Sequence, residues 1–228
     1  MNNLGKLYIV ATPIGNLEDI TLRALRVLKE VDLILCEDTR VTKKLLDRYE
    51  IQKPLLSYHH HSKLSRVDKI IEHLENGKNL ALVSDAGTPG VSDPGNILVE
   101  RITRDGERDR VEIVPVPGPS AISAIASVAG ISMSKFTFLG FPPHKKGRET
   151  FFRGVAEAKY PVVFFESPHR FLKNLELLEK MKPDAKLVIG RELTKMFEEI
   201  KRGSIGEILE YYKDNSEKVK GEFVIIVY

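Results

Sequence analysis

Short apolar runs alternate with amphipathic segments along the first half of the chain. The apolar runs are rich in β-branched side chains, which is typical of buried strands; they cover residues 6–11, 32–36, 80–83 and 111–114. The segments between them repeat apolar positions at helical spacing and predict helices over residues 19–29, 39–49, 65–75 and 97–103. This alternation predicts a mostly parallel sheet with helices on both faces.

Capping residues indicate where several helices begin and end. We expect Asp19 and Thr39 to cap the first two helices, because their side-chain oxygens can accept backbone N–H groups. Gly77 stands where a left-handed residue would end the third helix. Ser167 followed by Pro168 predicts the start of a helix in the second half.

A proline-rich segment at residues 115–119 interrupts the alternation. We interpret it as the boundary between two domains, residues 1–115 and residues 116–228. Beyond it the pattern resumes, with helices expected at 121–129, 168–181 and 205–212 and strands at 136–140, 162–165, 187–190 and 223–227. The predicted fold class is therefore α/β, with two α/β domains.

Polar or glycine-rich loops follow six of the predicted strands. Ligands of open α/β sheets bind beyond the carboxyl ends of the strands, so these loops predict a ligand site. The loop at 84–95 lacks the signature of a nucleotide triphosphate or dinucleotide loop, and its glycines instead allow a ligand to approach the backbone closely. Asp85 adds a carboxylate suited to an ammonium or hydroxyl group. Tight turns without a ligand are the alternative interpretation.

Composition narrows the class of protein only slightly. The 228 residues carry 35 Lys and Arg against 32 Asp and Glu, a formal charge of +3, which is too mild to indicate a nucleic-acid partner by itself. The one cysteine, Cys36, lies in an apolar run and predicts a buried thiol rather than a nucleophile. No apolar run approaches the length of a membrane span, so we expect a cytoplasmic protein without a membrane partner.

Basic side chains cluster in two places, and a solvated loop is the ordinary interpretation of any single charged run. Three consecutive histidines at 59–61 point alternately to opposite sides of an extended chain, so they cannot bind one metal ion, and we expect no metal. Clustered cations are instead typical of phosphate binding. The residues that we predict to contact RNA are His59, Lys63, Arg66, Lys145, Lys146 and Arg148.

Several of these loops together resemble a known family. The motifs are ATPIGNLEDIT at 11–21, CEDTR at 36–40, SDAGTPG at 84–90, PGPSA at 117–121, GF at 140–141 and RELTK at 191–195. They resemble the tetrapyrrole methylase superfamily, in the branch that methylates small-subunit ribosomal RNA. The resemblance implies the tetrapyrrole-methylase-like fold of class III methyltransferases, with S-adenosyl-L-methionine bound in a cleft between two α/β domains. It also implies a homodimer that methylates the 2′-hydroxyl of a cytidine in the decoding region of 16S rRNA. It implies cofactor contacts at Pro13, Ile14, Asp85, Ala86, Thr88, Ser120, Ala121, Phe165, Arg191 and Glu222.

Methyl transfer to a ribose hydroxyl requires alignment of the reactants and removal of a proton. Three residues in these motifs are candidates for the proton acceptor: Asp38, Glu192 and Lys195. Arg40 and Arg191 are better suited to clamp a phosphate or carboxylate, since a guanidinium group binds both in a bidentate manner. A helix cap with a local ion pair could also explain the motif at 37–40, and an ion pair at helical spacing the motif at 191–195.

Two other functions stay open from the sequence. A methylase of tetrapyrrole precursors would share the cofactor site, and a non-catalytic module that binds RNA or the ribosome would share the fold. A serine hydrolase is not indicated, because residues 84–87 lack the pattern of a nucleophile elbow.

Overall fold

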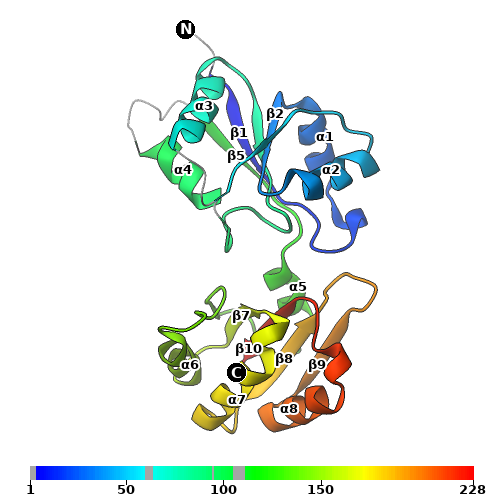
Figure 1. Ribbon diagram of the computed structural model, residues 1–228, viewed down its shortest axis with the longest axis vertical. Coiled ribbons are helices and arrows are strands. Elements are labelled where there is room, and N and C mark those ends of the chain that lie inside the picture. The colour runs from blue at the N-terminus through cyan, green and yellow to red at the C-terminus, as the bar shows by residue number, and fades with distance from the viewer. Residues whose placement is uncertain (1–3, 60–63, 94, 105–110) are drawn as a thin grey trace. The chain divides into compact units, whose positions relative to one another are not determined.

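The computed structural model describes residues 4–59, 64–93, 95–104 and 111–228. The chain divides into two compact units, residues 1–120 and 121–228, each with its own sheet and helices (Figure 1). The α/β class is confirmed. The boundary that we predicted after residue 115 lies five residues before this division, because Pro115 and Val116 still pair with Ile9 and Val10 of the first sheet. Proline is tolerated there because its strand is at the edge of the sheet.

The first unit is a parallel sheet between two pairs of helices. Its strands lie in the order β3-β2-β4-β1-β5. Their bounds are β1 Lys6–Val10, β2 Leu33–Cys36, β3 Leu55–Ser57, β4 Leu80–Leu82 and β5 Glu112–Val116, and the helices are α1 Leu22–Glu30, α2 Thr39–Arg48, α3 Leu64–Glu75 and α4 Gly95–Thr103.

Side-chain alternation along the strands divides the core of the first unit into two clusters. Ile34 and Ala81 pack with α1 and α2 on one face, while Leu35 and Leu80 pack with α3 and α4 on the other. Figure 1 shows the two helix pairs on opposite faces. Burial on both faces explains why these strands are almost continuously apolar.

The second unit has a mixed sheet in the order β6-β7-β10-β8-β9. Its strands are β6 Thr137–Phe138, β7 Val162–Glu166, β8 Lys186–Arg191, β9 Glu199–Ser204 and β10 Phe223–Val227, and its helices are α5 Ala121–Ser127, α6 Arg148–Ala156, α7 Pro168–Met181 and α8 Ile205–Asp214. The helices α6, α7 and α8 cover one face of this sheet. On the other face, α5 approaches so closely that a Cβ on Gly190 would lie 2.8 Å from Ile125 Cδ1.

Strand direction places three loops of the second unit at one edge. β6 runs parallel to β7, and β7 and β8 are both antiparallel to β10. The carboxyl ends of β6, β7 and β8 therefore share an edge of the sheet.

Two of the predicted helix starts are wrong. Asp19 lies in a 3-10 turn, and α1 is capped by Thr21, whose side chain accepts a hydrogen bond from Ala24 N at 3.0 Å. The cap of α2 is Asp38 rather than Thr39. The predicted start of α7 at Pro168 and the left-handed conformation of Gly77, with φ +78°, are confirmed.

Two strands and one α-helix were not predicted from the sequence: β3, β9 and α6. β3 has three residues and β9 reads EIKRGS, so neither has a clear alternation of apolar and polar positions. α6 follows the basic loop, and its cap, Gly147, offers no side chain to mark the start. Among the described residues, no helix is both long and apolar enough to span a membrane.

Candidate functional site

Loops at the carboxyl edge of the first sheet are held together by hydrogen bonds. Thr12, after β1, exchanges two backbone hydrogen bonds with Gly87, after β4, at 2.9 and 3.0 Å. The buried Thr12 hydroxyl donates to Ser84 O at 3.2 Å. Thr88 Oγ1 donates to Pro119 O, after β5, at 3.3 Å. We call residues 12–14, 84–88 and 117–120 the first-unit loop cluster.

Five of the predicted cofactor residues lie in the adjoining loops of this cluster after β1 and β4. They are Pro13, which is buried, Ile14 and Thr88, which are half-buried, and Asp85 and Ala86, which are exposed. Gly87 between them has φ +79°, a conformation that other residues adopt at a cost. Ser120 ends the first unit and Ala121 begins α5 in the second.

The loop after β2 joins the cluster through Asp38. Asp38 N donates to Asp85 Oδ1 at 3.0 Å. The Asp38 carboxylate accepts from Arg40 N at 2.8 Å and forms an ion pair with Arg40 Nη2 at 2.6 Å. The side-chain hydrogen bond from Arg40, aided by its backbone N–H, lowers the pKa of Asp38 to about 2. Asp38 is therefore a carboxylate at neutral pH, and the helix cap and local ion pair that we considered as alternatives are both present.

In the second unit, Glu192 and Lys195 are bound to each other and to Glu222, which precedes β10. Lys195 Nζ lies 2.8 Å from Glu192 Oε1 and 3.0 Å from Glu222 Oε2. Glu222 N also donates to Glu192 Oε1 at 2.8 Å. Glu192 has φ +51°, so its backbone is held in the left-handed region.

These contacts fix the charges of both groups. Burial works to raise the pKa of Glu192, but hydrogen bonds from Lys195 and from Glu222 N outweigh it and lower that pKa. Burial works to lower the pKa of Lys195, but its bonds to the two carboxylates outweigh it and raise that pKa. At neutral pH, Glu192 is a carboxylate and Lys195 an ammonium group.

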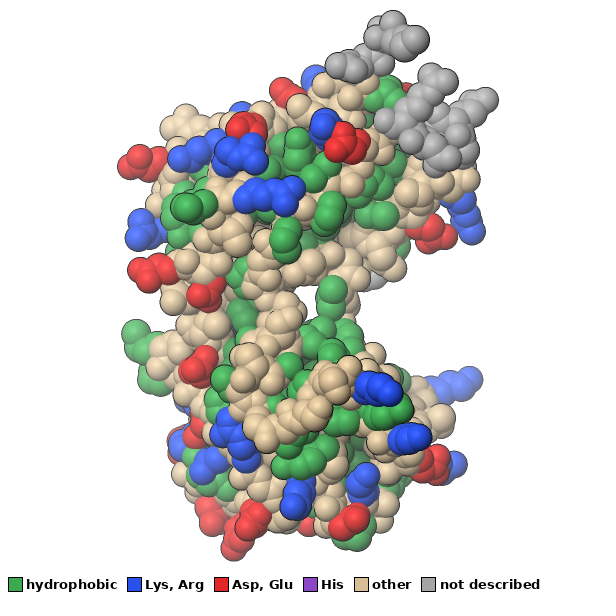
Figure 2. Space-filling model, turned by 180° about the vertical axis from the view of Figure 1, so that it is seen from behind, with side chains coloured by type: hydrophobic (Ala, Val, Ile, Leu, Met, Phe, Trp, Pro, Cys, Tyr) green, Lys and Arg blue, Asp and Glu red, His purple; other side chains and the backbone are tan. Residues whose placement is uncertain are grey.

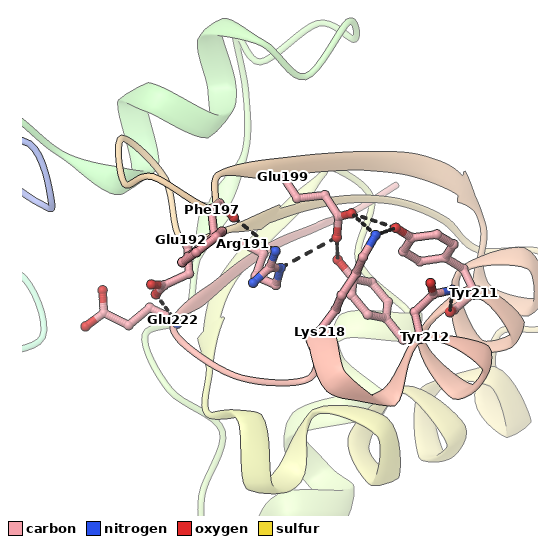
Figure 3. A network of polar contacts seen from close by, with 9 residues as sticks. Arg191, Glu192, Phe197, Glu199, Tyr211, Tyr212, Lys218 and Glu222 are labelled. Atoms are coloured by element: carbon pink, nitrogen blue, oxygen red, sulfur yellow. Dashed lines mark hydrogen bonds and ion pairs between the residues drawn. The ribbon is translucent and has the colours of Figure 1, made fainter.

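Arg191 holds the hairpin formed by β8 and β9. Its side chain is 9% exposed, its Nε lies 3.6 Å from Glu199 Oε2, and its Nη2 donates to Phe197 O at 3.0 Å. Figure 3 shows the guanidinium group pointing toward Glu199, with Glu192 and Glu222 on the other side of Arg191. A role of Arg191 in binding the cofactor or a phosphate stays a prediction; its buried Nε has no hydrogen-bond partner, so the contacts within the protein satisfy the group only in part.

Glu199, which the sequence did not indicate, is the centre of this network. Its carboxylate accepts hydrogen bonds from Tyr211 Oη at 2.6 Å, Tyr212 Oη at 3.2 Å and Lys218 Nζ at 3.0 Å. Burial works to raise the pKa of Glu199, but these donors lower it; burial beside this carboxylate raises the pKa of Tyr212. The network joins β9, α8 and the turn after α8.

The remaining predicted residues lie in separate places, except that Glu222 is bound to Lys195 and Glu192. Phe165 is half-buried at the end of β7, and the Glu222 side chain is 76% exposed. His59 is exposed, Lys63 lies outside the described residues, and Arg66 Nη1 donates to Ser57 O at 2.7 Å, which ties α3 to β3. Lys145, Lys146 and Arg148 belong instead to the second unit.

The charges of the protein surface are mixed. On the face that Figure 2 draws, acidic side chains lie among the basic ones in both units. In the described part of the chain, no three His, Cys, Asp or Glu residues are grouped as metal ligands would be.

Comparisons with known proteins identify what this arrangement is similar to. The model of the family "Tetrapyrrole (Corrin/Porphyrin) Methylases" matches residues 6–209. The ribosomal RNA small subunit methyltransferase I of Thermotoga maritima is 45% identical over 98% of both chains. The protein of the same name from Neisseria meningitidis is also 45% identical, over 98% of this chain and 76% of its own length.

Solved structures show the same fold at lower identity. Diphthine synthase matches with a TM-score of 0.74 and 15% identity, covering 98% of this chain and 89% of its own. The methyltransferase CobJ matches with a TM-score of 0.71 and 21% identity, covering 98% and 93%.

Proposed function

The chain belongs to the tetrapyrrole (corrin/porphyrin) methylase family, and on this premise we propose that it methylates the 2′-hydroxyl of a cytidine ribose in the decoding region of 16S ribosomal RNA. The methyl donor of the family is S-adenosylmethionine. The observation that carries the proposal is the nearly full-length identity of 45% to proteins named for methylation of small-subunit ribosomal RNA. A homodimer stays a prediction of the resemblance.

The first-unit loop cluster fits the methyl donor. It combines the exposed Asp85 carboxylate with backbone groups and the small residues Ala86 and Gly87. A carboxylate suits the ammonium or hydroxyl groups of the donor, and the buried Gly87, with φ +79°, forms the turn that leaves Asp85 and Ala86 at the surface. The residues that would hold the donor here are Pro13, Ile14, Asp85, Ala86, Thr88 and Ser120. Contacts from Ala121, Phe165, Arg191 and Glu222 remain part of the prediction.

S-adenosylmethionine supplies an electrophilic methyl group on a positively charged sulfur. The protein must therefore hold the ribose hydroxyl in line with that group and accept its proton. Of the three candidate acceptors, Asp38 and Glu192 are in the basic form at neutral pH, whereas the raised pKa of Lys195 keeps it protonated. We assign the role of proton acceptor to one of these two carboxylates. Lys195 and Arg40, which are positively charged, would instead bind and orient a phosphate of the substrate.

The test is transfer of a labelled methyl group by the purified protein to small ribosomal subunits, with tetrapyrrole precursors offered in parallel. We expect label in 16S rRNA, at a 2′-O-methylcytidine. Label in the precursor alone would establish the small-molecule methylase instead. If calorimetry detected no binding of S-adenosylmethionine, the protein would be a non-catalytic module and the proposal would be wrong.

A further inference from the structure

The loop between β6 and α6 presents an aromatic ring together with cations. In residues 139–147, which we call the Phe141 loop, the Phe141 side chain is 52% exposed. Lys145 and Lys146 in the same loop are also exposed, and Arg148 follows as the first residue of α6. The sequence from 139 to 148 contains no carboxylate. Figure 2 shows several Lys and Arg side chains on the side of the second unit where α6 lies.

The exposed ring is supported from behind by two others. The centroid of Phe141 lies 5.3 Å from that of Phe165, and Phe165 lies 5.0 Å from Phe138. These are ordinary packing distances for aromatic rings. About half of the Phe141 side chain stays open to a ligand while the rest is held by the protein.

Hydrogen bonds fix the backbone on both sides of Phe141. Phe165 N donates to Gly140 O at 2.8 Å, and Arg170 Nη1 donates to Pro142 O at 2.8 Å. Arg170 is itself fixed by an ion pair with Glu166 at 3.1 Å, in which the Glu166 side chain is fully buried. Phe141 is therefore presented in a pre-formed position, which reduces the entropy lost when a ligand binds.

We propose that Phe141 stacks against an unpaired base of the RNA substrate while Lys145 and Lys146 bind adjacent phosphates; this inference rests on the proposed function. Proteins recognise single-stranded RNA by stacking splayed bases on aromatic side chains beside a basic surface. Every base has a stacking face, so Phe141 contributes affinity and position rather than sequence specificity.

The tip of the β8–β9 hairpin is a less suitable platform, although it is more exposed. Met196 is 90% exposed and Phe197 is 69% exposed. The carboxylates Glu192, Glu198 and Glu199 stand among the cations of the same loop and hairpin, so the charge there is mixed, whereas residues 139–148 contain cations and no carboxylate. Charge complementarity to RNA therefore favours the Phe141 loop.

Substitutions of Phe141 test the proposal by measuring RNA binding without turnover. Phe141→Ala and Phe141→Leu should each weaken binding of small ribosomal subunits and of a single-stranded decoding-region RNA about tenfold. Leucine keeps an apolar side chain but lacks the stacking face. Phe141→Tyr should retain the wild-type affinity. Binding of S-adenosylmethionine, followed by calorimetry, should change in none of these variants.

Tyr160→Ala is the matched control. Tyr160 is 41% exposed, and the Nζ atoms of Lys135 and Lys159 each lie 5.7 Å from the centroid of its ring. Like Phe141, it is an exposed aromatic ring beside cations. It precedes β7, however, and so lies at the opposite edge of the sheet. We expect RNA binding by this variant to equal that of the wild type.

Two results would overturn the proposal. One is wild-type RNA affinity in Phe141→Leu; the other is loss of S-adenosylmethionine affinity without loss of RNA affinity in Phe141→Ala, which would assign the ring to the cofactor. Failure of the unchanged protein to methylate ribosomal RNA would instead reject the proposed function, and the binding assays keep the two failures distinguishable.

Discussion

The loops at the strand ends of the two units are held in place by different interactions. In the first unit, backbone groups and hydroxyls connect Thr12 to Gly87 and Thr88 to Pro119. In the second unit, charged side chains do so, as in the pair of Arg191 with Glu199. These connections leave the Asp85 carboxylate exposed, where it accepts one hydrogen bond from Asp38 N, whereas an ion pair engages both of the side chains that form it. A charged residue that is already ion-paired, such as Glu192 or Asp38, is therefore weaker evidence for catalysis than the exposed Asp85.

The largest effect is expected from Arg170→Ala in the second unit. This substitution leaves Glu166, whose side chain is fully buried, without its ion-pair partner. We expect the unfolding free energy of the second unit to fall by about 3 kcal/mol or more, measured by urea denaturation. Arg26→Ala, which breaks a pair 60% and 57% exposed in the first unit, is the control and should cost about 0.5 kcal/mol or less. Equal losses of unfolding free energy in the two variants would contradict the view that a buried ion pair stabilises the second unit.

A smaller effect is expected from Gly87→Ala in the first unit. The φ of +79° makes alanine unfavourable by about 1–2 kcal/mol, while the new Cβ would meet Ile14 Cγ2 only at an ordinary 3.4 Å. Thermal unfolding should report this loss, and the affinity for S-adenosylmethionine should fall with it.

Gly154→Ala is the matched control for Gly87→Ala. Gly154 lies inside α6, and its Cβ would meet nothing within 4 Å. Alanine should therefore stabilise the helix by about 0.5–1 kcal/mol. If cofactor binding survived Gly87→Ala unchanged, the cluster would not be the cofactor site.

Acidification should weaken the second unit through Glu192 and Glu199. The pKa of each is lowered from 4.5 in the folded protein, so their contribution to stability is present above pH 4.5 and is lost as the pH falls through the folded pKa values. Urea midpoints between pH 7 and pH 3 measure this, and the double variant Glu192→Gln, Glu199→Gln should show a flatter pH dependence. An unchanged slope in the double variant would show that these carboxylates do not contribute.

The smallest effect, on the rate of methyl transfer, is expected from Lys195→Arg. Lys195 stays protonated between Glu192 and Glu222, and arginine keeps the positive charge there. The kcat of methyl transfer should change only slightly, whereas removal of a general base costs about 100-fold or more. A loss of that size would make Lys195 the proton acceptor and contradict its assigned ionisation.

The sequence predicted the loop cluster because parallel strands place their carboxyl ends at one edge whatever the details of the turns. The sequence did not identify the helix caps correctly. Two possible capping residues precede or begin each helix, Asp19 and Thr21 for α1 and Asp38 and Thr39 for α2, and the path of the backbone decides which of them caps. The role of Glu199 could not be predicted, because its partners Tyr211 and Lys218 are 12 and 19 residues away. For the same reason, the ion pair of Lys195 with Glu222 was not visible in the RELTK motif.

The most direct test of the account is to map ribose methylation on 16S ribosomal RNA from cells with and without this protein. The account predicts one 2′-O-methylcytidine in the decoding region that disappears when the protein is removed and returns with the wild-type protein. An unchanged methylation map would contradict it.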